Sequence, residues 1–152
     1  MMFRAFSRER DFEAIVRIWQ ECGWIDDGET DKAGLRSFLS GVFGVVAAPR
    51  GEVEALASVR EAALQYEDRS LPAALVASVN VGRVARGRGL GGRACAMAIA
   101  EAAHRGAAVI HLGMFDQGYY DKLGFGSGPP HRFMGVRPAD LLVKVPGAMP
   151  VR

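Results

Sequence analysis

The apolar residues of this chain recur with two spacings, one typical of helices and the other typical of strands. Between Ser7 and Cys22 they fall three or four residues apart, which predicts a helix that Ser7 caps and Gly23 ends. Segments 31–40 and 89–105 predict two further helices, and 117–123 predicts a short one. Continuous apolar runs bounded by turn residues predict strands at 2–6, 42–48, 53–64, 74–81, 107–112 and 131–136.

The connections between these elements complete the predicted architecture. Residues 66–72 are expected to be a polar link between two strands, and residues 25–30 an acidic loop. The helix at 89–105 has small residues along one side, namely Gly91, Ala94, Cys95, Ala98 and Ala102. The order β-α-α-β-β-β-α-β-α-β-β implies an α+β fold, in which helices cover both faces of a mixed sheet. We expect one domain at 1–145 and a linker-like tail at 146–152.

Composition narrows the class of protein. The 152 residues are 49% hydrophobic and 24% charged, which is ordinary for a globular domain. Arginines far outnumber lysines, but 17 acidic residues hold the net charge at +2, so no nucleic acid partner is expected. No apolar run reaches the roughly 18 residues of a membrane span. Because Cys22 and Cys95 are isolated and predicted to be free thiols, we expect a cytoplasmic protein that binds no membrane.

The most informative motif is a junction rich in glycine and arginine between a predicted strand and a predicted helix. Residues 81–93 read VGRVARGRGLGGR, and no Asp or Glu occurs from residue 69 to residue 100. A helix that begins with glycines leaves its first backbone N–H groups accessible to an anion. The junction therefore predicts a site for the phosphate or pyrophosphate of a cofactor.

Two familiar phosphate loops do not fit this junction. Residues 87–92 satisfy G-x-G-x-x-G, but a dinucleotide site also needs an acidic residue roughly 20 positions later, and residues 107–112 contain none. A Walker loop is excluded because no Gly-Lys-Ser or Gly-Lys-Thr follows. The pattern that remains is Arg86-x-x-Gly89-x-Gly91.

This pattern, at the end of an apolar strand, resembles the coenzyme A loop of the GCN5-related N-acetyltransferases. Residues 116–125, which read DQGYYDKLGF, are similar to a second hallmark of that superfamily. The two motifs occur in the family's order, and the predicted elements extend the resemblance over nearly the whole chain. The resemblance implies a central, mostly antiparallel sheet and the use of acetyl-CoA.

A narrower resemblance is to the N-terminal domain of acetyltransferases of the enhanced-intracellular-survival type. It rests on residues 71–74, 79–81, 115–120 and 131–141. Proteins of that type continue into further domains, and their terminal carboxylate acts as the base. Their substrate and their base are therefore not carried over to this chain.

The superfamily resemblance implies how coenzyme A would bind. Asn80, Val81 and Gly82 would pair with the amides of the pantetheine arm, and the Val81 N–H would lie near the thioester carbonyl. Asp116 is assigned to the same cofactor site. The loop that would hold the pyrophosphate comprises Arg86, Gly87, Arg88, Gly89, Leu90, Gly91, Gly92 and Arg93.

The same resemblance makes Tyr120 the expected catalytic acid, since it occupies the family's tyrosine position, while Tyr119 is expected to be a core aromatic residue. A phenol can protonate the departing coenzyme A thiolate. The general base stays open among candidates that no spacing selects, namely Glu61, Glu67, Asp116 and His111. No metal site is expected, because the three histidines are scattered.

These observations predict an acetyl-CoA-dependent N-acetyltransferase that transfers acetyl directly to a primary amine of a small molecule. The acidic loop at 26–29 favours a cationic acceptor. The alternatives are an acetyl-CoA-binding regulatory or degenerate module with little activity and, outside this fold, a nucleotide- or RNA-binding module. Exposed apolar residues predict a homodimer, and these are Met114, Phe115, Phe133, Met134 and 141–145.

Overall fold

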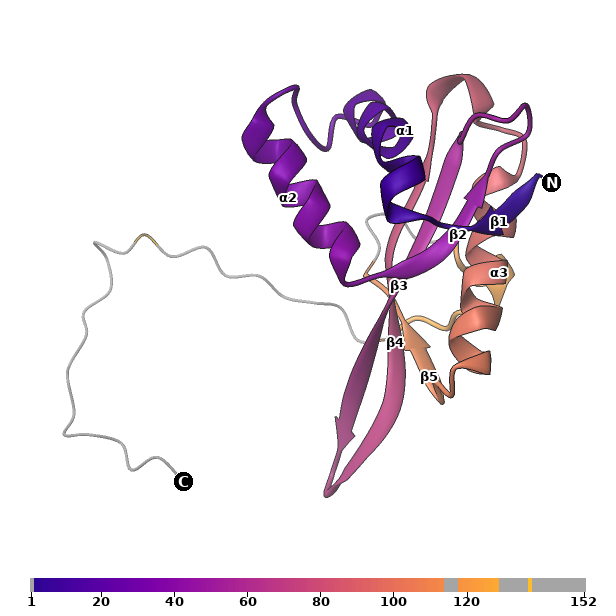
Figure 1. Ribbon diagram of the computed structural model, residues 1–152. Helices are drawn as coiled ribbons and strands as arrows, with labels where there is room; N and C mark the ends of the chain where they lie inside the picture. Colours follow the sequence, from indigo (N-terminus) through magenta and orange to yellow (C-terminus); the bar gives the residue numbers. More distant parts are fainter. Residues whose placement is uncertain (1, 114–117, 129–136, 138–152) are drawn as a thin grey trace.

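A computed structural model of the chain describes residues 2–113, 118–128 and 137 (Figure 1). Its centre is a five-stranded sheet in the order β1-β2-β3-β4-β5. The strands are β1 (Phe3–Ala5), β2 (Phe43–Ala47), β3 (Ala55–Tyr66), β4 (Arg69–Val81) and β5 (Val109–His111). Neighbouring strands are antiparallel except β4 and β5, which are parallel. The predicted mixed, mostly antiparallel sheet is therefore confirmed.

Helices cover both faces of this sheet, as the sequence predicts. The helices α1 (Arg8–Glu21) and α2 (Glu29–Ser40) lie on one face, and α3 (Leu90–His104) lies on the other. Alternation along the strands explains the two layers, because successive side chains point to opposite faces. Val46 and Leu56 are buried under α1 and α2, whereas Val45 and Ala57 are buried under α3.

The side of α3 that carries the small residues is buried against the sheet. Ala94, Cys95 and Ala98 are fully buried against β2, β3 and β4. Small side chains let the helix backbone approach the sheet closely, so α3 can serve as the crossover that a parallel pair of strands requires. This places the N-terminus of α3 beside the end of β4, where the glycine-rich loop lies.

The prediction of a polar link at 66–72 is wrong. The strands β3 and β4 continue as a long hairpin whose turn is Glu67-Asp68, and Figure 1 shows this hairpin extending beyond the rest of the sheet. Polar composition there reflects exposure to solvent and not the absence of a strand. Pro72 is tolerated because its backbone faces β5, where its carbonyl accepts the Ala108 N–H at 2.8 Å and no donor is needed from the proline.

The ends of the other predicted elements agree with the structure to within a few residues. Gly23 follows α1 with a φ of +71°, and Gly89 is the N-cap of α3. Of the predicted short helix at 117–123, only a 3-10 turn at Asp121–Leu123 is observed. The predicted strand at 131–136, the tail at 146–152 and the residues behind the homodimer prediction lie outside the described residues. Within the described ranges, no helix is long and apolar enough to cross a membrane.

Candidate active site

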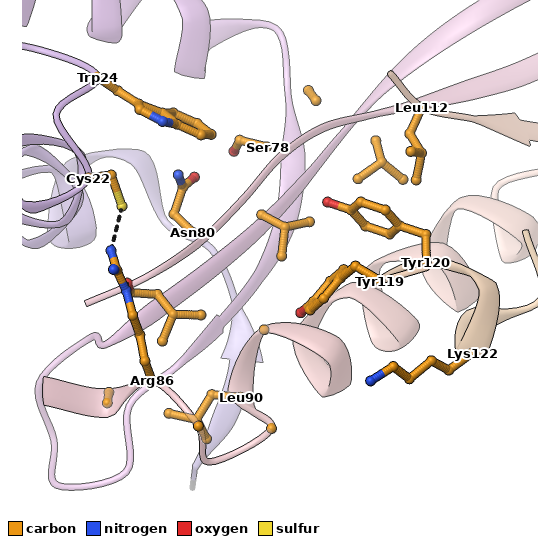
Figure 2. A pocket seen from close by; sticks show the side chains of 18 of the residues that line it. Cys22, Trp24, Ser78, Asn80, Arg86, Leu90, Leu112, Tyr119, Tyr120 and Lys122 are labelled. Atoms are coloured by element: carbon orange, nitrogen blue, oxygen red, sulfur yellow. Dashed lines mark hydrogen bonds between the residues drawn. The ribbon is translucent and has the colours of Figure 1, made fainter. Parts of the chain in front are cut away.

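A bulge in β4 marks the place where the site begins. Ser58 pairs with Ser78 and Val59 pairs with Val76, so Ala77 is an extra residue in β4. The parallel pairing with β5 ends at Leu75, and beyond it β4 has no neighbouring strand on that side among the described residues. A cavity of about 720 Å³ opens at this edge (Figure 2), and we call it the β4 cleft.

Backbone groups of β4 point into this cleft at alternate residues. The Gly82 N–H donates to the Glu54 carbonyl of the β3 side at 2.9 Å, so by alternation the backbone groups of Val79 and Val81 face the cleft. Consistent with this, the Val81 carbonyl accepts a bond from Arg86 Nε at 3.2 Å. The backbone of Val79, which our sequence analysis missed, is thus placed like that of Val81. The backbone groups of Asn80 and Gly82, which the sequence analysis assigned to the pantetheine arm, instead face β3. Counting back two residues from Val81 could have found it.

The glycine loop ends in an open helix N-terminus. Gly87 and Gly89 adopt φ values of +74° and +71°, a region that favours glycine. The first bond of α3 runs from the Arg93 N–H to the Gly89 carbonyl at 3.1 Å, so the N–H groups of residues 90–92 have no partner within the helix. No side chain caps them.

The three described helices differ in the charge of their first turn. α1 has Glu9 and Asp11 there, and α2 has Glu29 and Asp31. α3 has no acidic residue in its first turn. Acidic side chains stabilise a helix N-terminus by offsetting its partial positive charge, and only in α3 does that charge stay available to an external anion.

Gly91 is required by close packing at the mouth of the cleft. A Cβ added there would lie 3.0 Å from both the Tyr119 hydroxyl and the Val81 side chain. The expectation that Tyr119 is a core aromatic residue is wrong, because 44% of its surface is exposed and it lines the cleft. The Tyr119 hydroxyl lies beside the start of α3, where the absence of a side chain on Gly91 leaves room for it.

Tyr120 lies opposite β4 in the same cleft. Its ring packs edge-to-face against Tyr119, with centroids 4.8 Å apart, and against Phe125 at 6.0 Å. Figure 2 shows its hydroxyl pointing across the cleft toward β4. Burial, together with the nearby Cys95 and Tyr119, raises the pKa of Tyr120 above its ordinary value. The phenol is therefore protonated at neutral pH and can act as a proton donor.

The arginines of the loop have different surroundings. Arg86 lines the cleft, and its guanidinium lies 3.5 Å from the Cys22 sulfur. Arg93 stacks over the Phe3 ring at 5.1 Å, and neither it nor Arg88 is among the residues that line the cleft. Asp116 lies outside the described residues.

An ion-pair cluster fixes the C-terminal end of α1 to the end of β4. The Glu21 carboxylate accepts the Arg83 backbone N–H at 2.7 Å and pairs with Arg17 at 2.8 Å. The bond from the Arg83 N–H and the neighbouring guanidinium of Arg17 outweigh partial burial, so the pKa of Glu21 is lowered. This cluster holds the segment that carries Cys22 and Trp24 beside the cleft.

The predicted general bases that the structure describes, Glu61, Glu67 and His111, do not line the cleft. Glu61 faces Arg105 at 3.6 Å, Glu67 lies in the hairpin turn, and His111 is exposed at the end of β5. The titratable residues that line the cleft are Cys22, Arg86, Tyr119, Tyr120 and Lys122, and none of the described carboxylates or histidines is among them. A search of the described residues also finds no cluster of His, Cys, Asp and Glu that could hold a metal ion.

The acidic loop likewise stays outside the cleft lining. Asp27 pairs with Lys32 at 2.9 Å, and the Asp31 carboxylate accepts the Asp26 N–H at 2.7 Å. Part of the negative charge that led us to predict a cationic acceptor is therefore already paired with Lys32.

Comparison with known proteins identifies the fold. No family model and no curated protein matches the sequence. Among solved structures, an Agrobacterium tumefaciens protein that carries the provisional name acetyltransferase has a TM-score of 0.72 at 19% identity, covering 90% of this chain and 100% of its own. A transcriptional regulator from Bacillus halodurans has a TM-score of 0.71 at 21% identity, covering 88% and 98%. An aminoglycoside acetyltransferase from an uncultured soil sample has a TM-score of 0.64 at 17% identity, covering 89% and 97%.

The chain therefore has the fold of the GCN5-related N-acetyltransferases, as the two motifs predicted. In this chain the β4 cleft lies where the parallel β4–β5 pair ends, beside the bulge in β4 and the open N-terminus of α3. None of these matches concerns the enhanced-intracellular-survival type, and that narrower resemblance stays a prediction.

Proposed function

We propose that this protein is an acetyl-CoA-dependent N-acetyltransferase that transfers acetyl directly to the primary amine of a small molecule. The observation that carries the proposal is the composition of the β4 cleft. At one end lies a helix N-terminus without acidic residues in its first turn, along one side lie the backbone groups of Val79 and Val81, and opposite them lies a protonated Tyr120. A phosphorylated thioester has chemical groups that match each of these three features.

The residues present fit coenzyme A in three respects. Gly87 and Gly89 have open space where a Cβ would stand, so a ligand can approach the backbone of the loop. The N–H groups of residues 90–92 can donate to phosphate oxygens, with Arg86 adding positive charge nearby. The backbone of Val79 and Val81 can pair with an extended chain that carries amides, as a further strand would.

The bound thioester would supply the acyl group and a thiolate leaving group. The N–H groups of Val79 and Val81 would stabilise negative charge that develops on a carbonyl oxygen, and one such fixed donor contributes about 2.7–4 kcal/mol. Tyr120 would donate its phenolic proton to the departing sulfur. Because an ordinary thiol has a pKa near 8.5, protonation by the phenol mainly assists departure in the transition state.

A second candidate is an acetyl-CoA-binding module with little activity. The observation that favours it is the lack of a carboxylate or histidine among the described residues that line the cleft. An acceptor amine must lose a proton, so without such a group only the fraction that is already neutral would react.

The two candidates are separated by measuring binding and transfer in the same preparation. Acetyl-CoA at about 100 times its dissociation constant should stabilise the fold by about 2.7 kcal/mol, whereas NAD and ATP should not. Release of free thiol with a panel of small primary amines, above the rate without amine, would support the transferase. Stabilisation by acetyl-CoA with no amine-dependent release would support the binding module, and stabilisation by NAD alone would contradict both.

A further inference from the structure

Asn80 has a buried side-chain amide for which the described part of the chain supplies no partner. Only 2% of the residue is exposed, and neither its Nδ2 nor its Oδ1 makes a hydrogen bond with any described residue. Buried polar groups are nearly always paired in folded proteins, so an amide with both atoms unpaired needs an explanation. Asn80 also lines the β4 cleft, which makes a ligand the natural partner.

The amide lies on the opposite face of β4 from the glycine loop. Asn80 pairs across the sheet with Leu56, which is buried beneath α1 and α2. Val79 and Val81 face α3, as does the mouth of the cleft at Gly91. In Figure 2 the amide points away from Arg86, toward the part of the cleft where Trp24 and Ser78 lie. A ligand that bonds Asn80 would therefore approach from the α1 side, while coenzyme A would enter from the α3 side.

Two neighbours define the rest of this subsite. Ser78 lies on the same face, and its hydroxyl shares one hydrogen bond of 2.7 Å with Ser58, which leaves it able to make another. The Trp24 indole is 48% exposed and is held edge-on against Trp19 at 5.2 Å. An aromatic face beside two uncharged polar groups suits an apolar body that carries a neutral polar group.

The charges of the cleft argue against a polycationic acceptor. The charged side chains among the described lining residues are those of Arg86 and Lys122, and both are cationic. The acidic loop at 26–29 does not line the cleft. Discrimination must then come from hydrogen bonds and stacking, because no anionic side chain in the described lining is placed to attract a second ammonium group.

We propose that Asn80 is a specificity-determining residue that selects an amine bearing an adjacent neutral group, a carboxamide or a hydroxyl, which both donates and accepts hydrogen bonds. Its Oδ1 accepts from that group and its Nδ2 donates to it, while the apolar body of the acceptor lies on Trp24. The inference rests on the proposed function, since it names the acceptor of that same site. A buried amide left unpaired rejects an analogue that lacks the matching group.

The test uses four probes with the same aromatic body and the same primary amine. Phenylalaninamide and phenylalaninol carry the neutral donor–acceptor group, phenylalanine methyl ester only accepts, and phenethylamine has neither function. We expect kcat/KM for the first two to exceed that for phenethylamine by about 10-fold or more. In Asn80→Leu this ratio should fall to about 2-fold or less, with affinity for acetyl-CoA kept within a few-fold.

The matched control is Gln65→Leu, the same chemical change on the exposed β3–β4 hairpin, which should keep the wild-type ratio. Asn80→Leu should also keep or raise the melting temperature, because it removes an unpaired buried amide. If Asn80→Leu does not fold, Asn80→Ala is used for the same comparison. An unchanged ratio in the Asn80 variant, or an equal loss of acetyl-CoA affinity, would overturn the inference.

Binding separates this inference from the proposed function. If no probe is acetylated, calorimetry measures the binding of each probe to the protein loaded with coenzyme A. A preference for phenylalaninamide over phenethylamine that Asn80→Leu abolishes would support the subsite and reject the transferase. Equal binding of all four probes would overturn the subsite.

Discussion

On the α3 side of β4 the cleft presents the glycine loop and the backbone groups of Val79 and Val81, whereas on the α1 side it presents the side chains of Asn80, Ser78 and Trp24. The first surface comes from one continuous stretch of chain, from the end of β4 to the start of α3. The second combines β4 with a segment that follows α1, more than fifty positions earlier in the sequence.

This difference separates the binding of phosphate, which many ligands share, from the recognition of one particular acceptor. Backbone N–H groups at a helix N-terminus recognise phosphate whatever the rest of the ligand is. Side chains such as the Asn80 amide and the Trp24 indole recognise the shape and polarity of one class of molecule. We therefore expect the α3 side to determine cofactor affinity and the α1 side to determine which acceptor is used.

The largest expected effect concerns Tyr120, which lines the cleft and packs on the α3 side. Tyr120→Phe removes the proton donor and keeps the ring, so turnover should fall by roughly 10²–10⁴ while affinity for coenzyme A stays within a few-fold. Because burial raises its pKa, the phenol stays protonated through neutral pH, and the loss of activity on deprotonation should occur only above the ordinary pKa of a tyrosine. Steady-state kinetics against pH measure both effects, with Tyr66→Phe on the exposed hairpin as the control. Wild-type turnover in Tyr120→Phe would leave Tyr120 as a packing residue.

The next effect tests the α3 side alone. Gly89→Val places a branched side chain at a φ of +71° in the phosphate loop and should abolish the stabilisation by acetyl-CoA of about 2.7 kcal/mol. Gly51→Val makes the same change at a φ of +93° in the turn between β2 and β3, and Gly51 does not line the cleft. It should cost similar backbone strain and keep the ligand-induced shift. Thermal unfolding with and without acetyl-CoA compares the two, and loss of the shift in both variants would point to strain instead of ligand contact.

A smaller effect is expected where α1 is anchored to β4. Glu21→Gln weakens the bonds to the Arg83 N–H and to Arg17, and should cost about 1–2 kcal/mol of unfolding free energy at neutral pH. The folded pKa of Glu21 is lowered, so its contribution is present above its ordinary value of 4.5 and is lost as the pH falls through the folded pKa.

Urea unfolding at several pH values measures this difference. The wild type and Glu21→Gln should converge in acid, and Glu13→Gln on the exposed side of the same helix should match the wild type throughout. A gap between the wild type and Glu21→Gln that is independent of pH would show that charge is not the cause.

The smallest expected effect concerns the reactivity of the two cysteine thiols. Cys95 is fully buried on the side of α3 that faces the sheet, and burial raises the pKa of its thiol to about 11, whereas Cys22 lines the cleft. A thiol reagent should modify one cysteine in the native protein and two after unfolding. Acetyl-CoA should slow the modification of the native protein, and Cys22→Ala should eliminate it. Rapid modification of Cys95 in the native protein would contradict its burial.

The sequence predicted the conformations of the glycine loop and the packing of α3 well, because these signals are local. Glycines at 87 and 89, the strand before them and the small residues of α3 all lie within one short stretch, and each has the conformation or burial that its type implies. The hairpin at 66–72 was missed because local polarity cannot distinguish a loop from strands exposed to solvent. Tyr119 was assigned to the core because aromatic residues are usually buried, and only the fold shows that its hydroxyl lies beside Gly91 on another element.

By itself, the sequence determined the two layers, the order of the elements as far as β5 and the glycine conformations of the loop before α3, since apolar spacing and glycine conformations act over a few residues. Only the tertiary structure decided which backbone groups of β4 face the cleft, because that depends on its register with β3. It also brought Trp24 and Asn80 to one cavity and kept Glu61 and Glu67 out of it. Side chains from distant segments meet only through packing, and no spacing along the chain records that meeting.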